Sequence, residues 1–84
     1  MTVEQLQVLE PEKTVDARGT ACPGPLLEVK RAVSQVAKGA LVEVLSSDQS
    51  SNRDIPLWAR KAGHEYLGTV EEAGFCRIYV RRGQ

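Results

Sequence analysis

Charge imbalance, long apolar runs and metal-binding side chains are all scarce in this 84-residue sequence. Lysine and arginine together number 11, as do aspartate and glutamate, so no global field attracts the chain to nucleic acid or to an anionic membrane. No apolar stretch approaches the roughly 20 residues that cross a bilayer. The first residues also lack the basic start and apolar centre of a signal peptide. We therefore expect a soluble, cytoplasmic protein without membrane contact.

Cysteine and histidine are equally scarce. The sequence has two cysteines, Cys22 and Cys76, and one histidine, His64. Two cysteines do not form the disulfide framework of a small secreted domain, and without a Cys-x-x-Cys pair a structural zinc site lacks its usual ligands. We expect both thiols to be reduced and no metal to be bound. His64 is expected to be a surface or capping residue at a helix-to-strand junction.

The length allows one domain with one modest core. Residues 1–12 are mostly polar and end in Leu9-Glu10-Pro11-Glu12, which is typical of a tail or a short leading segment. The domain proper is expected to run from residue 13 to residue 84.

Hydrophobic periodicity predicts alternating strands and helices in that domain. A helix is expected from Leu26 to Lys38, ended by Gly39. Strands are expected over four segments that are β-branched or alternate apolar with polar residues: 14–18, 40–45, 64–70 and 75–81. In the first strand Val15 and Ala17 face inward, and the last two strands form a hairpin around residues 71–74.

A second helix is predicted by apolar residues at helical spacing, which are Ile55, Trp58, Ala59 and Ala62. Ser51 or Asp54 is available as its N-cap, Pro56 is expected in its first turn, and Gly63 ends it. The resulting order, β-α-β-α-β-β, predicts a two-layer α+β fold. A four-stranded mixed sheet carries both helices on one face and leaves the other face more open to solvent.

The segment Cys22-Pro23-Gly24-Pro25 stands at the start of the first predicted helix. Pro25 suits the first helical turn, because the N–H that it lacks would have no partner there, and Pro23 biases Cys22 toward an extended backbone. Either Cys22 or Gly24 is the N-cap. In both arrangements the positive end of the helix dipole favours the thiolate of Cys22, which is the nucleophilic form. Gly24 lets a partner approach the sulfur closely.

Positive side chains flank this thiol in the sequence. Arg18 lies four residues before Cys22, and Lys30 and Arg31 follow one to two turns later, so part of their charge is available to the thiolate. These features favour a reactive thiol. The alternative is that Cys22 is a small apolar filler at a helix start, as free cysteine often is.

The second cysteine is not expected to act with the first. Glycine and proline occupy the second and third positions after Cys22, so no resolving cysteine is adjacent. Strand alternation places Cys76 on the same side as Ile78 and Val80, in the core, where we expect it to be inert. Cys22 therefore requires a second thiol from another molecule.

Two motifs in this sequence resemble those of one family. The run Asp16-Ala17-Arg18-Gly19-Thr20-Ala21-Cys22-Pro23-Gly24-Pro25 is similar to the Cys-Pro-x-Pro signature of the TusA (SirA-like) sulfur carrier proteins. Arg53-Asp54-Ile55-Pro56, Trp58 and Gly63-His64-Glu65 resemble the second helix and its exit in that family. The resemblance spans about residues 13 to 82 and implies the same β-α-β-α-β-β fold.

The resemblance implies that Cys22 accepts sulfane sulfur as a persulfide from a cysteine desulfurase or a rhodanese-type donor. Cys22 then passes the sulfur to a reactive cysteine of an acceptor, such as a DsrE-like protein. We expect a stoichiometric, monomeric carrier rather than a stand-alone enzyme, with no cofactor besides the transient persulfide. The pathway stays open among tRNA thiolation, molybdenum-cofactor supply and dissimilatory sulfur oxidation.

The remaining candidate residues match family positions near the two motifs. Pro23, Gly24 and Pro25 are expected to shape the site of Cys22. Four charged residues are candidates for partner docking or for charge stabilisation: Asp16, Arg18, Arg53 and Asp54. For the last two, capping of the second helix is an equally good interpretation.

A different class of function remains as an alternative. An open sheet face with Phe75, Arg77, Tyr79 and Arg81 would offer the aromatic and cationic groups that single-stranded RNA binders use. The neutral net charge and the small aromatic content, one Phe, one Trp and two Tyr, argue against it.

Overall fold

The computed structural model describes residues 3–7, 10–20 and 24–84 of the chain. The elements follow one another as two helices and two strands in alternation, preceded by a short helix and followed by a hairpin. Their bounds are α1 (Val3–Gln7), β1 (Lys13–Asp16), α2 (Gly24–Ser34), β2 (Leu41–Ser46), α3 (Ser51–Lys61), β3 (Glu65–Glu72) and β4 (Phe75–Arg81). The order β-α-β-α-β-β is confirmed from β1 onward, and α1 is an addition to it.

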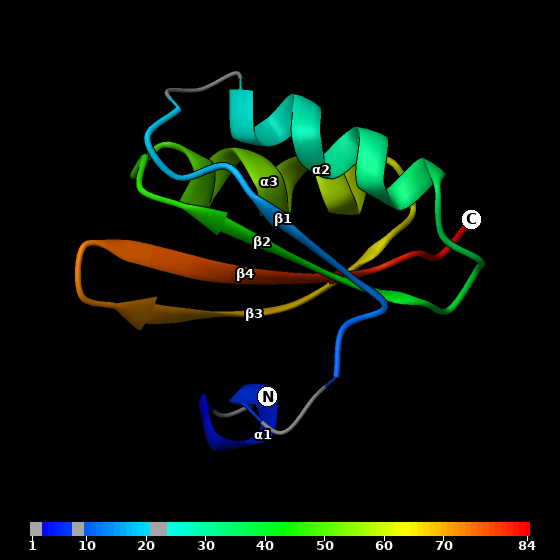
Figure 1. The fold of residues 1–84 in the computed structure, drawn as a ribbon. Helices are drawn as coiled ribbons and strands as arrows, with labels where there is room; N and C mark the ends of the chain where they lie inside the picture. The colour runs from blue at the N-terminus through cyan, green and yellow to red at the C-terminus, as the bar shows by residue number, and fades with distance from the viewer. Residues whose placement is uncertain (1–2, 8–9, 21–23) are drawn as a thin grey trace.

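The four strands form one mixed sheet in the order β1-β2-β4-β3. β1 runs parallel to β2, whereas β4 is antiparallel to both β2 and β3. The carboxyl ends of β1 and β2 therefore lie at the same end of the sheet as the tip of the β3–β4 hairpin. α2 and α3 follow β1 and β2 directly, so their amino ends lie at this end too (Figure 1). We call it the site end of the sheet.

α2 and α3 cover one face of the sheet and enclose the main core (Figure 1). Val29 and Val33 of α2 and Ile55 of α3 are at most 3% exposed, and they pack against the helix-facing side chains of the central strands. Those partners are Val42, Val44, Ile78 and Val80. The apolar positions found from the sequence therefore make the core, because residues at helical spacing meet alternate residues of the strands.

The outer face of the sheet is partly covered by α1, which the sequence did not predict (Figure 1). Leu6 of α1 is 2% exposed and packs with Leu41, Val70 and Tyr79 in a second apolar cluster. A β-bulge interrupts β3 between Tyr66 and Gly68, and a Cβ on Gly68 would stand only 2.7 Å from Leu6 Cδ1. The expected tail thus contains a docked helix, and the expected open face is closed where α1 lies.

The bounds of the helices also differ from the expectations, and α2 begins at Gly24 rather than at Leu26. α2 ends at Ser34 rather than Lys38, because Gln35 and Val36 donate backbone bonds to the residues three positions before them and tighten the last turn. α3 begins at Ser51 with Ser50 as its N-cap, so neither Ser51 nor Asp54 is the cap. Pro56 consequently lies in the second turn of α3, inside the helix, rather than in the first.

Candidate functional site

The amino end of α2 has the local structure that the sequence predicts. α2 begins at Gly24, and the buried Pro25 lies in its first turn, where a missing N–H costs nothing. Cys22 and Pro23 lie outside the described residues, so the expectation that Cys22 is the N-cap is not tested. Gly24, the other candidate, is itself helical and is therefore not the cap. No acidic residue stands in the first turn of α2. The positive end of this helix is therefore not neutralised within its own first turn.

The turn that leads toward Cys22 is fixed by Asp16 and Arg18. The Arg18 guanidinium donates to both carboxylate oxygens of Asp16, at 2.9 Å and 2.8 Å, and the Arg18 backbone N–H donates to the same side chain at 3.1 Å. These bonds from the Arg18 side chain and backbone lower the pKa of Asp16 to about 2. The reciprocal bonds raise the pKa of Arg18. The two candidate residues thus meet as an exposed ion pair.

The same turn is also bonded to the loop after β2. Gly19, at φ 79°, donates its backbone N–H to Ser47 Oγ at 2.8 Å. The Thr20 N–H donates to Ala17 O at 3.3 Å and closes the turn. A Cβ on Gly24 would overlap the Thr20 methyl group, so a glycine is needed there for the packing of this chain. Both described flanks of the Cys22 segment, Thr20 and Gly24, therefore touch one another.

An aromatic side chain joins this turn to the hairpin, and the sequence had not placed it here. The Arg18 guanidinium carbon lies 4.9 Å from the centroid of the Phe75 ring, and that of Arg77 lies 5.5 Å from it. Arg77 also pairs with the carboxylates of Glu43 and Glu72, each at 3.4 Å. Alternation had placed Phe75 on the outward side of its strand. Its proximity to Arg18 follows only from the strand order, which the sequence pattern does not give.

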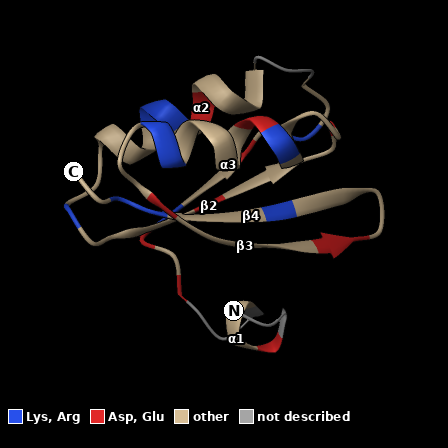
Figure 2. Ribbon diagram, turned by 180° about the vertical axis from the view of Figure 1, so that it is seen from behind, with Lys and Arg blue, Asp and Glu red and all other residues tan. Residues whose placement is uncertain are grey.

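A hollow of about 600 Å³ opens at the site end between the β2–α3 loop and the hairpin tip. Its lining includes three carboxylates, from Asp48, Glu71 and Glu72, and the thiol of Cys76. Figure 2 shows the acidic end of β3 beside a basic segment of β4. Cys76 is half-buried rather than in the core as expected, and its Sγ accepts a hydrogen bond from Asn52 Nδ2 at 3.5 Å. It lies on the helix-facing side of β4 as predicted, but near the strand's end, where the helices do not cover it fully.

Arg53 and Asp54 lie in the first turns of α3 and pair with each other at 3.5 Å. Arg53 projects into solvent with 82% of its side chain exposed. An acidic residue in the first turn of a helix complements the helix dipole, so stabilisation of the start of α3 accounts for Asp54 without a role in docking. His64 is half-buried against Trp58, and its Nδ1 accepts the Gly83 N–H at 3.0 Å. Burial and the charge of Arg82 lower the pKa of His64.

The surface required for the RNA-binding alternative is not available. Tyr79 is only 3% exposed, beneath α1. Its burial, together with the hydrogen bond that its hydroxyl donates to the Glu43 carboxylate, raises its pKa to about 12. Arg77 and Arg81 are engaged by carboxylates, Arg81 by Glu65 at 3.0 Å. Of the two aromatic residues in this alternative, Tyr79 is buried and the half-buried Phe75 is already contacted by Arg18 and Arg77, so they do not offer the platform on which bases stack.

Two further properties concern metals and membranes. Among residues 3–7, 10–20 and 24–84, no three His, Cys, Asp or Glu side chains gather in a way that could hold a metal ion. No helix in these same ranges is long and apolar enough to cross a bilayer.

The fold and the site together define a class of small two-layer α+β proteins in which a helix begins at one end of a mixed sheet, two positions after a cysteine in the sequence. The family model described as sulfurtransferase TusA matches residues 13–82. This chain therefore belongs to the TusA family.

Relatives of known name agree with this assignment. A protein of Archaeoglobus fulgidus, named provisionally as a sulfur carrier protein, is 53% identical over 68 residues, which cover 81% of this chain and 93% of the relative. The sulfur carrier protein TusA of Pseudomonas entomophila is 38% identical over 71 residues, covering 84% and 89% of the two chains. The crystal structure of a SirA-like protein from Desulfitobacterium hafniense superposes with a TM-score of 0.69 at 27% identity, over 86% of this chain and 99% of that one.

Proposed function

We propose that this protein is a sulfur carrier that holds sulfane sulfur as a persulfide on Cys22 and passes it to a cysteine of an acceptor protein. The observation that carries the proposal is the match of residues 13–82 to the TusA family, a range in which Cys22 stands two positions before Gly24, the first residue of α2. Relatives named as sulfur carriers support the proposal.

The chemistry needs only one thiolate at a time. The Cys22 thiolate attacks the outer sulfur of a persulfide on the donor protein. A new S–S bond forms at Cys22, while the donor's own S–S bond breaks and releases its cysteine as a thiolate. The acceptor thiolate then attacks the outer sulfur on Cys22 in the same manner. Each transfer moves one sulfur atom without net oxidation, so no cofactor or external reductant is required.

The amino end of α2 supports both anionic states of the carrier. The thiolate and the persulfide each carry one negative charge beside the positive end of the helix dipole. Gly24 and Pro25 open that helix, and its first turn holds no carboxylate that would oppose the anion. Together with Pro23, these residues shape the site.

The partners in this proposal are proteins that themselves bear reactive sulfur. The donor is a cysteine desulfurase or a rhodanese, and the acceptor carries a reactive cysteine, as DsrE-like proteins do. Leu27 in the first turn of α2 is 53% exposed, and an exposed leucine beside the site suits a protein partner better than a small molecule. Arg53, also exposed at this end, together with Asp54, Asp16 and Arg18, is available for polar contacts at the rim.

A loading experiment tests the proposal. The protein is incubated with a cysteine desulfurase and cysteine, or with a rhodanese and thiosulfate, and its intact mass is measured before and after reduction. We expect the mass to rise by one sulfur atom and to return on reduction. Cys22→Ser should abolish the gain, whereas the matched variant Cys76→Ser should retain it. Equal loading of Cys22→Ser and the unaltered protein would refute the proposal.

A further inference from the structure

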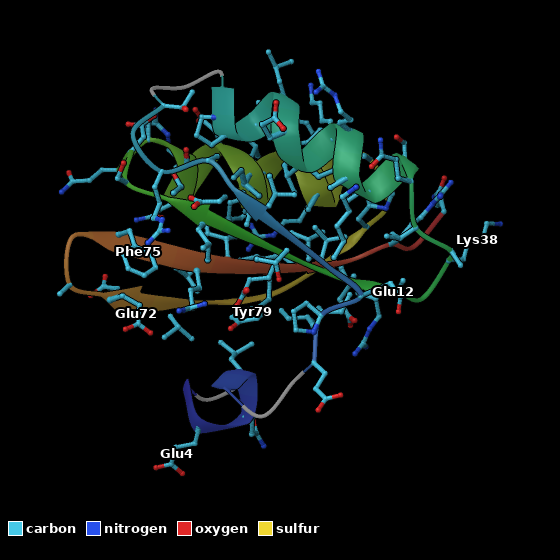
Figure 3. All side chains as sticks on the ribbon, in the orientation of Figure 1. Glu4, Glu12, Lys38, Glu72, Phe75 and Tyr79 are labelled. Carbon is cyan, nitrogen blue, oxygen red and sulfur yellow. The ribbon has the colours of Figure 1, made fainter. Side chains whose placement is uncertain are left out.

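One side-chain contact connects the turn before the Cys22 segment with the tip of the β3–β4 hairpin. The Arg18 guanidinium carbon lies 4.9 Å from the centroid of the Phe75 ring. Phe75 is the first residue of β4, and Figure 3 shows it at the hairpin end of the sheet, with Glu72 on the neighbouring strand. β2 separates β1 from β4 in the sheet. The contact therefore joins two elements that no strand-to-strand hydrogen bonds connect directly.

The Arg18 side chain is held in a defined position over this ring. Its two hydrogen bonds to Asp16, at 2.9 Å and 2.8 Å, fix the plane of the guanidinium. Asp16 is the last residue of β1, so this anchor belongs to the sheet and not to the turn. The guanidinium thus links three positions: the end of β1, the turn itself and the hairpin tip.

The Phe75 ring is equally well anchored. Arg77 approaches it at 5.5 Å, and Arg77 is tied by ion pairs to Glu72 across the hairpin and to the buried Glu43 of β2. Two guanidinium groups therefore contact one half-buried ring. Because the face of an aromatic ring is negative, this arrangement is attractive even though both neighbours are cations.

We propose that Phe75 is a positioning residue for Cys22, because its ring holds Arg18 and thereby fixes the turn over residues 17–20, from which the Cys22 segment departs. The proposal rests on the proposed function of that cysteine. Thr20, the last described residue before the segment, is bonded to this turn through its N–H to Ala17 O at 3.3 Å. If the Phe75 ring is removed, the turn keeps its hydrogen bond from the Gly19 N–H to Ser47 Oγ in the β2–α3 loop but loses its contact with the hairpin.

Two substitutions of Phe75 separate the ring's electrostatic role from its bulk. Phe75→Leu keeps an apolar side chain but removes the negative ring face, whereas Phe75→Tyr keeps the ring. Both are made in the Cys76→Ser protein, so that alkylation and mass report on Cys22. For each variant we would measure the rate of sulfur loading, the pH profile of iodoacetamide alkylation and the melting temperature.

We expect Phe75→Leu to slow loading about two- to fivefold, the range that a partly exposed cation–π contact supports, and to shift the midpoint of the alkylation profile. Phe75→Tyr should behave like its parent in both assays. If Phe75→Leu only lowers the melting temperature, while loading and alkylation match the parent, the side chain is structural and the proposal is wrong. A Phe75→Tyr variant as slow as Phe75→Leu would overturn it as well.

Arg18→Gln on its own keeps the test informative if Phe75→Leu folds poorly, and where Phe75→Leu folds, the two substitutions form a double-mutant cycle. Arg18→Gln removes the cation but retains a hydrogen-bonding side chain of similar length. We expect Arg18→Gln alone to slow loading, and the double variant to be little slower than either single one. Fully additive effects would exclude the coupling. If even the Cys76→Ser parent takes up no sulfur, the carrier function fails instead, and the alkylation profiles still decide whether Phe75 positions the thiol.

Discussion

Leu6→Ala tests the unexpected attachment of α1 to the outer face of the sheet. Leu6 is 2% exposed, and burying a leucine contributes about 1.5–3 kcal/mol. Ordering the five residues of α1 costs conformational entropy, so the net free energy of docking is smaller than the sum of the favourable contacts that α1 makes. If Leu6→Ala weakens the contact too far, α1 can detach from the sheet, so no cavity has to remain. The loss of unfolding free energy therefore cannot exceed the free energy with which α1 docks on the sheet. We therefore expect a loss of about 1–2 kcal/mol, whereas Ile55→Ala in the fully buried main core should cost about 2–5 kcal/mol.

Two probes in the same chain report this difference. Trp58 packs against the main core in the helix layer, so its fluorescence follows global unfolding. A loss of about 1–2 kcal/mol of unfolding free energy corresponds to a fall in melting temperature of about 4–16 °C. Tyr79 follows the outer face. Detachment of α1 should lower its pKa from about 12 toward the ordinary value of 10.0, because burial is the main cause of the shift. A loss as large as that of Ile55→Ala would show that α1 belongs to the main cooperative core. Unchanged stability with an unchanged Tyr79 titration would show that Leu6 does not hold it.

Three further predictions follow from contacts already described. Gly68→Ala should destabilise the protein because the new Cβ would stand 2.7 Å from Leu6 Cδ1. The loss of unfolding free energy should be smaller when Leu6→Ala is also present, and chemical denaturation of the unaltered protein, the two single variants and the double variant would measure it. Asp16→Asn should lower the melting temperature at neutral pH, because the depressed pKa of Asp16 stabilises the fold above 3.8. The difference in melting temperature between Asp16→Asn and the unaltered protein should disappear as the pH falls to about 2. A difference that stays constant with pH would contradict the lowered pKa of Asp16. The raised pKa of Tyr79 predicts a loss of stability between pH 10.0 and about 12, which Tyr79→Phe should reduce and the control Tyr66→Phe should not.

The parts of the fold that the sequence predicted are those in which local periodicity decides which face is buried. Val29 and Val33 repeat at helical spacing, and Val42 and Val44 alternate along a strand, so their burial follows from local geometry. α1 has no such signal, because its attachment depends on one leucine meeting a glycine bulge far along the chain. Pro56 was misplaced for a related reason. The turns after Asp48 lead directly into α3 and start the helix earlier than the apolar pattern does.

The site was predictable only in part, for the same physical reason. The motif placed Pro25 in the first turn of a helix correctly, because the missing N–H of proline suits that position. The Asp16–Arg18 pair was named without its geometry, and the contact between Arg18 and Phe75 was missed. The Asp16–Arg18 pair is local, but the contact between Arg18 and Phe75 depends on which strands lie side by side, and residue spacing does not specify the strand order. Cys76 was assigned to the correct side of its strand, but the local pattern does not show how far the helix layer extends over it.

The ion pairs at the site end change how the cysteine anion is stabilised in the proposed carrier. Arg18, which the sequence made available to the thiolate, is engaged by Asp16. Arg31 stands in the last turn of α2, away from the site end, and its guanidinium lies 3.6 Å from the Glu28 carboxylate. The backbone N–H groups at the start of α2 therefore become a more important stabilising group than the Arg18 side chain. A helix end attracts both a thiolate and a persulfide, because each carries one negative charge. It raises the fraction of nucleophilic anion in both the empty and the loaded state, and this suits a carrier that must accept sulfur from one protein and release it to another.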